Sequence, residues 1–487
     1  MLRILPAALA LAAAAASMTA PGSARTTAPE TSPRWGACPE GVAAPGLECS
    51  RLDVPLDYRE PDGRTISIAV SRLASRNPDK RRGVLLTNPG GPGGYGLGLP
   101  AELKAAGLPR SVLDRYDIIG FDPRGAGRST PVTCGLPEEE IWGNIPPYAR
   151  DAADVARHAK RARTTAERCA ASRTADMLPH ISTRNTARDM DRVRAALGEK
   201  KLSYLGYSYG SHLGAVYTTL FPGRSDRIVL DSNMVPGGLD VTGARLMARG
   251  MEDRFPDFAA FAAARPAYGL GSTPEQVTAK YHELAERLDQ HPVRGVDGSY
   301  FRLLTLTFLY RDSRLPIVAE VWRALDNDQP LPPAADPSQR DPDVENKVAS
   351  HLYVICNDSR WPRSVRSYQR DVALDRQRYP MFGAAAASIR PCAFWKSEPT
   401  EPPVRVGDRG PSNVLMAQNT RDPGTPLVGA RQMRRALGDR ARMVTADQGG
   451  HGVYVLSGNA CVDRIVTGFL AGGERPARDL TCAAKPS

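Results

Sequence analysis

Gly206-Tyr207-Ser208-Tyr209-Gly210 is the stretch of this 487-residue sequence that decides its fold. It follows the run 202–205, which suits a short buried strand, and it precedes the run 211–217, which suits a helix packed closely on a sheet. Between a strand and a helix the chain must turn sharply, with Ser208 at the apex and its hydroxyl exposed. Glycine at 206 and 210 then has a steric reason, because a side chain at either position would collide with the crowded junction.

A serine at the apex of such a turn is a candidate nucleophile. The backbone N–H of Tyr209 would open the helix and point to the place where an oxyanion forms. The pentapeptide also arises by chance, and Ser208 would then be an ordinary turn residue. The interpretation as a nucleophile therefore requires a base, an orienting acid and a second oxyanion donor elsewhere in the chain.

The base should be a histidine after Ser208, because on folds with this turn the partners follow in the order Ser, Asp or Glu, His. His451 meets that condition, since it lies in the glycine-flanked stretch 448–452 just after the strand-like run 441–444. We therefore predict His451 as the base. The other histidines have less suitable positions: His158 and His180 precede Ser208, His212 falls one helical turn after it, His282 lies in a helix-patterned stretch, His291 precedes a proline in a loop, and His351 opens a strand-like run.

The acid that orients the histidine should follow a late strand. The run 414–417 is short and apolar, as expected of a buried parallel strand, and Asp422 lies in the turn-rich loop beyond it. The main competitor is Asp231, which ends the strand-like run 227–230, one unit after the nucleophile strand. We predict Asp422 as the acid, with Asp231 and a purely turn-forming role for Asp422 as the alternatives.

A glycine-rich loop, Asn88-Pro89-Gly90-Gly91-Pro92-Gly93-Gly94, follows another strand-like run at 83–87. Bare backbone of this kind can approach the reacting carbonyl, and we assign the second oxyanion N–H to Gly91. A flexible turn is the structural alternative. A phosphate-binding loop would end in Gly-Lys-Ser/Thr, which is absent here, and the prolines fit a dinucleotide-binding loop poorly.

A further loop at 120–129 is rich in glycine and charge and follows a strand-like run that ends at Phe121. Asp122 and Arg124 in this loop are expected to pin the loops around the serine turn. We assign them no part in the chemistry.

Strand and helix signals alternate from about residue 50 to 232 and resume near 413, which predicts an α/β fold with a mostly parallel central sheet and flanking helices. The stretch between them is helix-rich. Thr273, followed by proline and then Gln276, is typical of a helix N-cap. The predicted division is a core at 35–235 and 406–487 with a mainly helical cap insertion at 236–405.

The N-terminus has the pattern of a secretory signal peptide, predicted at residues 1–24. A charged start is followed by an apolar run at 4–16 and by small residues, with cleavage after Ala20 or Ala24. Residues 25–34 are expected to be flexible or to form a pro-segment. The apolar run is too short to span a bilayer, and no stable membrane insertion is expected. The predicted location is therefore secreted and extracellular.

Cysteine and charge patterns agree with export. The chain has eight cysteines, which suggests disulfides outside the cell, although about 105 pairings are possible. None has metal-site spacing, and no metal is predicted. The formal net charge of +11 is scattered along the chain, and aromatic residues are only 6%, so nucleic-acid binding is not expected. Pairing of sequence neighbours suggests Cys38–Cys49, Cys134–Cys169, Cys356–Cys392 and Cys461–Cys482.

These motifs resemble the secreted tripeptidyl aminopeptidase family of α/β-hydrolases, which is related to the prolyl aminopeptidases. The resemblance rests on five segments in the expected order, at 88–94, 120–129, 206–210, 421–425 and 449–452. It implies the α/β-hydrolase fold and a triad of Ser208, Asp422 and His451 that needs no cofactor. It also implies an exopeptidase that releases short peptides, typically tripeptides, from free N-termini.

Other functions remain open at this stage. Some relatives act as endoproteases or esterases, so a secreted carboxylesterase with the same triad is the first alternative, and an inactive peptide-binding module is the second. A large cap would favour small or terminal substrates. An aminopeptidase must also hold an ammonium group with carboxylates. The candidates are Glu252, Asp253, Glu320 and Asp358, and the sequence does not choose among them. It is also silent on the oligomeric state.

Overall fold

A computed structural model describes residues 32–141, 145–336 and 341–484 of the chain. Residues 32–487 form one compact unit. The predicted signal peptide at 1–24, most of the segment 25–34 and part of the proline-rich stretch near 340 lie outside the described residues.

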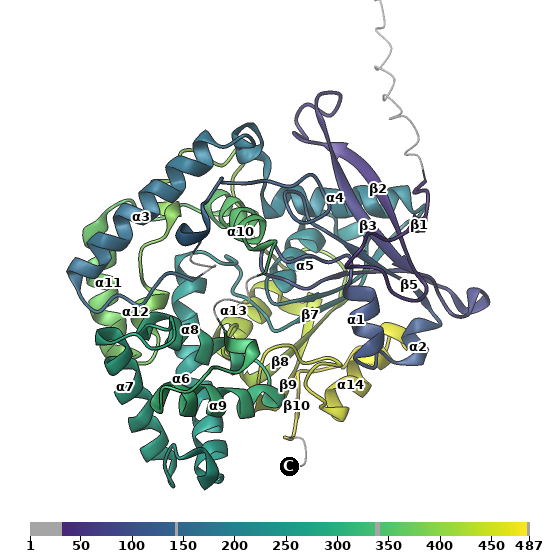
Figure 1. Ribbon diagram of the computed structural model, residues 1–487. Helices are drawn as coiled ribbons and strands as arrows, with labels where there is room; N and C mark the ends of the chain where they lie inside the picture. Colours follow the sequence, from purple (N-terminus) through teal and green to yellow (C-terminus); the bar gives the residue numbers. More distant parts are fainter. Residues whose placement is uncertain (1–31, 142–144, 337–340, 485–487) are drawn as a thin grey trace, which may run out of the picture. The chain divides into compact units, whose positions relative to one another are not determined.

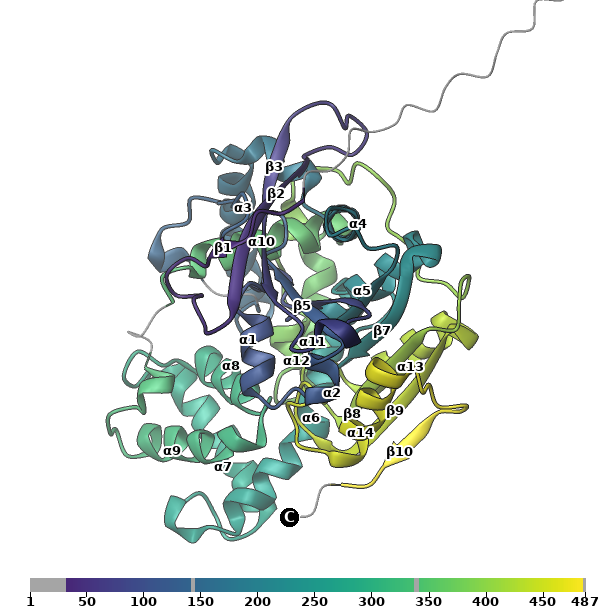
Figure 2. The same cartoon turned by 90° about the vertical axis from the view of Figure 1, so that its right-hand side faces the viewer.

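A single mixed sheet carries the motifs (Figure 1). Its strand order is β1-β2-β3-β5-β4-β6-β7-β8-β9-β10. The pairings from β1 to β5 are antiparallel, and those from β5 to β10 are parallel. The strands are β1 (Gly36–Ala37), β2 (Leu47–Pro55), β3 (Thr65–Leu73), β4 (Gly83–Asn88), β5 (Tyr116–Phe121), β6 (Leu202–Tyr207), β7 (Ser225–Asp231), β8 (Val414–Arg421), β9 (Ala441–Gly449) and β10 (Leu480–Cys482). Figure 2 shows β8, β9 and β10 side by side at one edge.

Central strands are buried on both faces, which explains their continuous apolar runs. Every residue of β4, β5 and β6 is buried. Alternate side chains enter different clusters: Val84 and Leu86 pack on one face, and Leu85 packs on the other. In register, Asn88 lies opposite Gly206, and Tyr207 lies opposite Asp231. The carboxyl ends of these parallel strands therefore meet at one edge of the sheet.

Helices cover both faces of the sheet, as their shared apolar clusters show. On one face lie α1 (Leu99–Ala105), α2 (Arg110–Leu113) and α14 (Ala460–Thr467). On the other face lie α4 (Thr183–Ala196), α5 (Tyr209–Leu220), α10 (Val344–Asp358) and α13 (Leu427–Leu437). This is the architecture of an α/β-hydrolase, as predicted.

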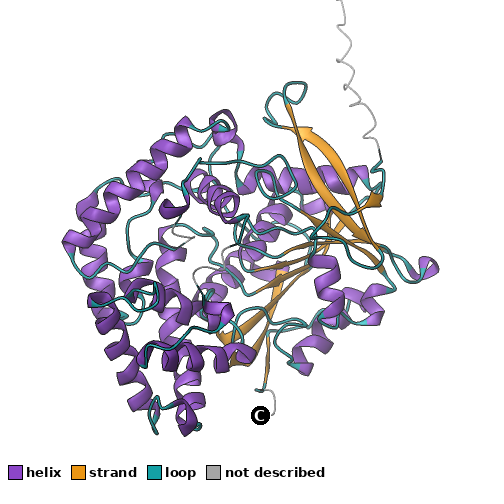
Figure 3. Cartoon of the chain, viewed as in Figure 1, coloured by secondary structure: helices purple, strands orange, loops and turns teal. Residues whose placement is uncertain are grey.

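A second group of helices lies between β7 and β8 in the sequence and has its own apolar core (Figure 3). Phe255 and Tyr281 pack around Trp322, with ring centroids 6.0 and 5.6 Å from it. Val155 and Ala159 of an earlier helix also enter this core, although sequence reasoning grouped that helix with the sheet. The predicted division into 35–235, 236–405 and 406–487 stays a prediction. The helices of the group are α6 (Val241–Ala263), α7 (Pro274–Gln290), α8 (Gly298–Phe308), α9 (Leu315–Asp326), α11 (Val365–Arg378) and α12 (Gly383–Ala386), and the earlier helix that joins their core is α3 (Ala152–Ala171).

Predictions that depend on residues close together in the sequence are confirmed. Thr273 caps α7 by accepting the N–H of Gln276 at 3.3 Å, as predicted. The four predicted disulfide pairs are confirmed. His351, predicted to open a strand, instead lies inside α10. A short apolar run such as 351–356 does not distinguish a buried helix from a buried strand, and here packing on the sheet selects the helix. Among the described residues, no helix is long and apolar enough to cross a membrane.

Candidate active site

Ser208 lies at the apex of a strained turn between β6 and α5. Its φ of 58° and ψ of −124° are unusual for a residue with a side chain. The turn is held by hydrogen bonds on both sides. The Ser208 N–H donates to the Asp231 carbonyl at 2.9 Å, and the N–H and hydroxyl of Ser211 donate to the Ser208 carbonyl at 2.8 and 2.6 Å. The strain is therefore imposed by the surrounding structure.

Glycines around Ser208 are required by close contacts. A Cβ at Gly206 would lie 2.4 Å from the Gly210 carbonyl oxygen, and one at Gly210 would lie 2.9 Å from the Asn88 carbonyl oxygen. A Cβ at Gly90 would lie 2.8 Å from the Ser208 Cβ. The glycine-rich loop after β4 therefore lies directly against the serine turn, as the sequence analysis expected.

Two backbone N–H groups at this junction are candidate oxyanion donors, those of Tyr209 and Gly91. Neither donates a hydrogen bond to another residue in the described part of the chain. The glycine-rich loop also packs closely against α10, because a Cβ at Gly93 would lie 2.5 Å from Ser350 Oγ and 3.0 Å from the His351 N. This contact with α10 was not foreseen from the sequence.

Asp422 and His451 are hydrogen-bonded. The Nδ1 atom of His451 lies 2.9 and 3.0 Å from the two carboxylate oxygens of Asp422. Asp422 is fully buried and also accepts the N–H groups of Gly424 and Thr425 and the Thr425 hydroxyl, each at 2.9 Å. The His451 side chain is 13% exposed, so its ring borders the solvent-accessible side of the pair.

Tyr310, just after α8, contacts the histidine. Its carbonyl accepts the His451 N–H at 2.8 Å, and the two ring centroids lie 4.7 Å apart. Sequence reasoning missed Tyr310, because nothing local marks a residue that reaches the histidine from so far along the chain. Burial and the Asp422 charge raise the pKa of the Tyr310 phenol.

Asp231, the alternative acid, accepts hydrogen bonds mainly from backbone N–H groups. Its carboxylate accepts the N–H groups of Val453 and Tyr454, both at 2.8 Å, and the Ser232 hydroxyl at 3.0 Å. Its carbonyl accepts the Ser208 N–H. Asp231 therefore ties the serine turn to the loop that follows His451. Burial raises the pKa of the Asp231 carboxyl to about 7, while the Tyr454 and Val453 N–H groups act in the opposite direction.

Asp122 and Arg124 are structural, as expected. Asp122 accepts the N–H groups of Gly96 and Leu97 at 2.8 and 3.1 Å, which fixes the end of the glycine-rich segment. Arg124 forms a fully buried ion pair with Asp189 of α4.

A cavity of about 680 Å³ lies within the helical group. Its lining includes Leu303 of α8, Phe382 next to α12 and Val344 of α10. One turn beyond Val344, the Lys347 carbonyl approaches Gly93, and Tyr310 follows α8. Two of the helices that line the cavity, α10 and α8, thus also carry or adjoin residues that contact the glycine-rich loop and His451.

The four candidate ammonium ligands differ in their surroundings. Asp253 pairs with Arg249, Glu320 is exposed, and Asp358 accepts hydrogen bonds from Thr183. Glu252 is partly buried and accepts the Met381 N–H at 3.0 Å, beside Phe382 of the cavity wall. Burial raises the pKa of Glu252. Within the described ranges, no group of three or more His, Cys, Asp or Glu side chains has an arrangement suited to a metal ion.

The fold and this site define an α/β-hydrolase with a strained serine turn, a glycine-rich loop against it and a hydrogen-bonded Asp–His pair at neighbouring strand ends. Residues 379–482 match the family model described as TAP-like protein. The tripeptidyl aminopeptidase of Streptomyces lividans is 36% identical over 90% of this chain and 84% of its own length. The chain therefore belongs to the tripeptidyl aminopeptidase family, which confirms the predicted resemblance, and it is a serine hydrolase.

Other relatives have different names. Serine protease Hip1 of Mycobacterium tuberculosis is 30% identical over 92% of this chain and 90% of its own length. Carboxylesterase B of the same species is 31% identical over 95% of this chain and 93% of its own length. The family thus includes proteins named for peptide and for ester substrates.

Proposed function

We propose that this protein is a serine exopeptidase that releases short peptides, most often tripeptides, from free N-termini. The observation that carries the proposal is the presence of a strained Ser208 turn and of a buried Asp422 bonded to His451 Nδ1 at 2.9 Å in one member of the tripeptidyl aminopeptidase family. The peptide substrate and the roles of individual residues are parts of this proposal.

In the proposed mechanism, Ser208 Oγ attacks the scissile carbonyl carbon while His451 Nε2 accepts the hydroxyl proton. Asp422 holds the histidine in the tautomer with its proton on Nδ1 and stabilises the imidazolium. The N–H groups of Tyr209 and Gly91 donate hydrogen bonds to the oxyanion. The C–N bond then breaks as His451 gives its proton to the leaving amine, and an acyl-enzyme on Ser208 remains. Water, deprotonated by His451, hydrolyses this ester and releases the short peptide.

Selection of a free N-terminus requires a carboxylate at a fixed distance from Ser208. Glu252 is the candidate that the surroundings support, because it is partly buried and has no ion pair with another described residue. The cavity beside it has the size of an ordinary ligand pocket and would hold the residues between the ammonium group and the scissile bond.

Action outside the cytoplasm is also part of the proposal. Four disulfides join all eight cysteines, and such bonds persist in oxidising compartments. The predicted signal peptide supports the same location.

The deciding experiment compares a tripeptide anilide with a free N-terminus, its acetylated form and an ester. The proposal expects turnover of the free peptide alone, with Ser208→Ala lowering kcat by about 10⁴- to 10⁶-fold. Glu252→Gln should raise KM for the free peptide by about 10- to 100-fold, the effect of losing one charged hydrogen bond. Glu320→Gln, at an exposed acid of the same insertion, is the matched control. Equal turnover of free and acetylated peptides would contradict N-terminal recognition.

A carboxylesterase with the same triad is the second candidate, favoured by the similarity to carboxylesterase B. Turnover of the ester without either anilide would support it and refute the peptidase proposal.

A further inference from the structure

The side chain of Tyr209 lies in the apolar core and makes a contact that the proposed mechanism does not use. Tyr209 is 3% exposed, and its phenol oxygen is hydrogen-bonded to the hydroxyl of Thr183, the first residue of α4. The Thr183 hydroxyl in turn lies 2.5 Å from Asp358 Oδ2, and the Thr183 N–H donates to Asp358 Oδ1 at 2.9 Å. Asp358 is the last residue of α10.

The direction of these hydrogen bonds follows from the groups involved. An ionised carboxylate only accepts, so the single hydroxyl hydrogen of Thr183 is donated to Asp358. Thr183 then has only lone pairs left for Tyr209, and the Tyr209 phenol must be the donor. The chain therefore runs from the Tyr209 O–H through the Thr183 O–H to the Asp358 carboxylate.

Thr183 is the hydrogen-bonding partner of Asp358, and the Arg184 guanidinium in the same cavity wall acts on the carboxylate from a longer distance. In the part of the chain that the structure describes, both of its hydrogen bonds come from Thr183, and no cation lies within ion-pair distance. Burial raises the pKa of the Asp358 carboxyl to about 6. Asp358 is partly buried, and its two hydrogen bonds from Thr183 offset the cost of keeping the carboxylate there.

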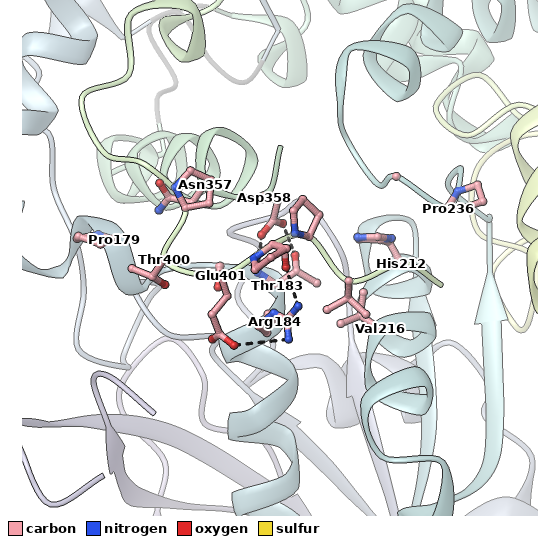
Figure 4. A pocket seen from close by; sticks show the side chains of 16 residues that line it. Pro179, Thr183, Arg184, His212, Val216, Pro236, Asn357, Asp358, Thr400 and Glu401 are labelled. Carbon is pink, nitrogen blue, oxygen red and sulfur yellow. Dashed lines mark hydrogen bonds and ion pairs between the residues drawn. The ribbon is translucent and has the colours of Figure 1, made fainter. Parts of the chain in front are cut away.

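Asp358 and Thr183 face a small cavity of about 50 Å³, which Figure 4 shows from close by. His212 and the segment 399–404 complete its wall, and Ser208 does not line it. The carboxylate therefore borders a space that Ser208 does not line. Its hydrogen bonds lead to the Thr183 N–H at the start of α4 and, through the Thr183 hydroxyl, to the Tyr209 phenol.

We infer that Thr183 and Asp358 are positioning residues for the oxyanion hole. They hold the Tyr209 phenol, and thereby the backbone N–H of the same residue, in the place where it meets the oxyanion. The same helix, α10, also packs against Gly93, in the loop that carries the other proposed donor, Gly91. The inference rests on the proposed function of Ser208 and Tyr209.

The test compares variants that remove single hydroxyl groups. Tyr209→Phe and Thr183→Val should each lower kcat by about 10- to 100-fold, less than the loss of an entire oxyanion donor, and leave KM within about twofold. Affinity for a peptide boronate, which forms a tetrahedral adduct with the serine, should fall in parallel with kcat. Thr183→Ser, which keeps the hydroxyl, should retain kcat within about threefold. Tyr217→Phe removes another buried phenol from the same helix and serves as the control.

If Asp358 and Thr183 only stabilise the start of α4, the variants should have lower thermal stability and unchanged kcat. The inference is overturned if Tyr209→Phe and Thr183→Val unfold at lower temperature yet keep kcat and boronate affinity. It is also overturned if Thr183→Ser loses as much kcat as Thr183→Val. If Ser208→Ala retains activity, the proposed function itself fails. If Ser208→Ala is inactive while Tyr209→Phe equals the wild type, only this inference fails.

Discussion

Two buried aspartates lie at the ends of neighbouring strands of the same sheet, and their carboxylates contact different groups. Asp231 at the end of β7 and Asp422 just after β8 are both inaccessible to solvent. The carboxylate of Asp422 reaches the ring of His451, whereas that of Asp231 reaches the backbone of Val453 and Tyr454. Residue type and strand position thus select two candidates for the acid that orients His451. The group that each carboxylate contacts then distinguishes them.

The largest difference should appear in catalysis. Asp422→Asn keeps the shape of the side chain but places an amide against His451 Nδ1, which favours the wrong tautomer. We expect kcat/KM to fall by about 10⁴-fold with little change in the unfolding temperature. Steady-state kinetics with the free tripeptide anilide measures the effect. A loss of less than tenfold would remove the distinction between the two aspartates.

The corresponding change on the other strand should act on stability. Asp231→Ala leaves two buried N–H groups without an acceptor, at a cost of about 2–4 kcal/mol in the free energy of unfolding. The unfolding midpoint at pH 5.5 should drop by several degrees, while kcat/KM of the folded protein falls by far less than in Asp422→Asn. An Asp231→Ala variant that is as stable as the wild type but inactive would make Asp231 the catalytic acid instead.

Asp231 should also make stability depend on pH. Its pKa is raised from 3.8 to about 7 in the folded state, so the folded protein binds more protons than the unfolded chain between these values. Stability therefore falls as the pH rises from about 4 to about 7. Asp231→Asn removes this titration, so the wild type should lose unfolding temperature relative to the variant across that range. A constant difference between the two proteins would show that Asp231 titrates normally.

The smallest expected effects involve the hydroxyl that each carboxylate accepts. Thr425→Val removes a donor to Asp422 and should lower kcat/KM by about two- to tenfold. Ser232→Ala removes the donor to Asp231 and the acceptor of the Gly452 N–H, and should lower stability by about 1 kcal/mol while kcat/KM stays within about twofold. Steady-state kinetics and thermal unfolding are measured for both variants. Equal losses of kcat/KM in Thr425→Val and Ser232→Ala would contradict the different roles of the two aspartates.

Much of the fold was predictable because it depends on local chemistry. The serine turn needs a strand, two glycines and a helix within a few residues, and each has its own pattern in the sequence. The disulfides join cysteines that are sequence neighbours in the order of the chain. The N-cap at Thr273 likewise depends on residues a few positions away.

Contacts between distant segments were not predictable. Tyr310 accepts the His451 N–H, α10 packs against Gly93, and Asp358 at the end of α10 accepts hydrogen bonds from Thr183 of α4. Each contact depends on how the helical group lies on the sheet, and no residue pattern near either partner reports that arrangement. Asp358 shows the consequence, since its hydrogen bonds to Thr183 could not be read from the residues around either position.

The sequence by itself determined the α/β architecture, the apex position of Ser208 and the set of side chains available to partner it. Tertiary structure decided which aspartate contacts His451. The pairing of β8 with β9 shifts register between Asn419 and Arg421, and Arg421 then lies opposite Gly449, so Asp422 emerges beside the histidine loop. Asp231 ends one strand further from β9 and meets the backbone beyond the histidine. Register and strand order arise only when distant segments pair, which is why the sequence could favour Asp422 over Asp231 while only the tertiary structure shows which carboxylate contacts the ring.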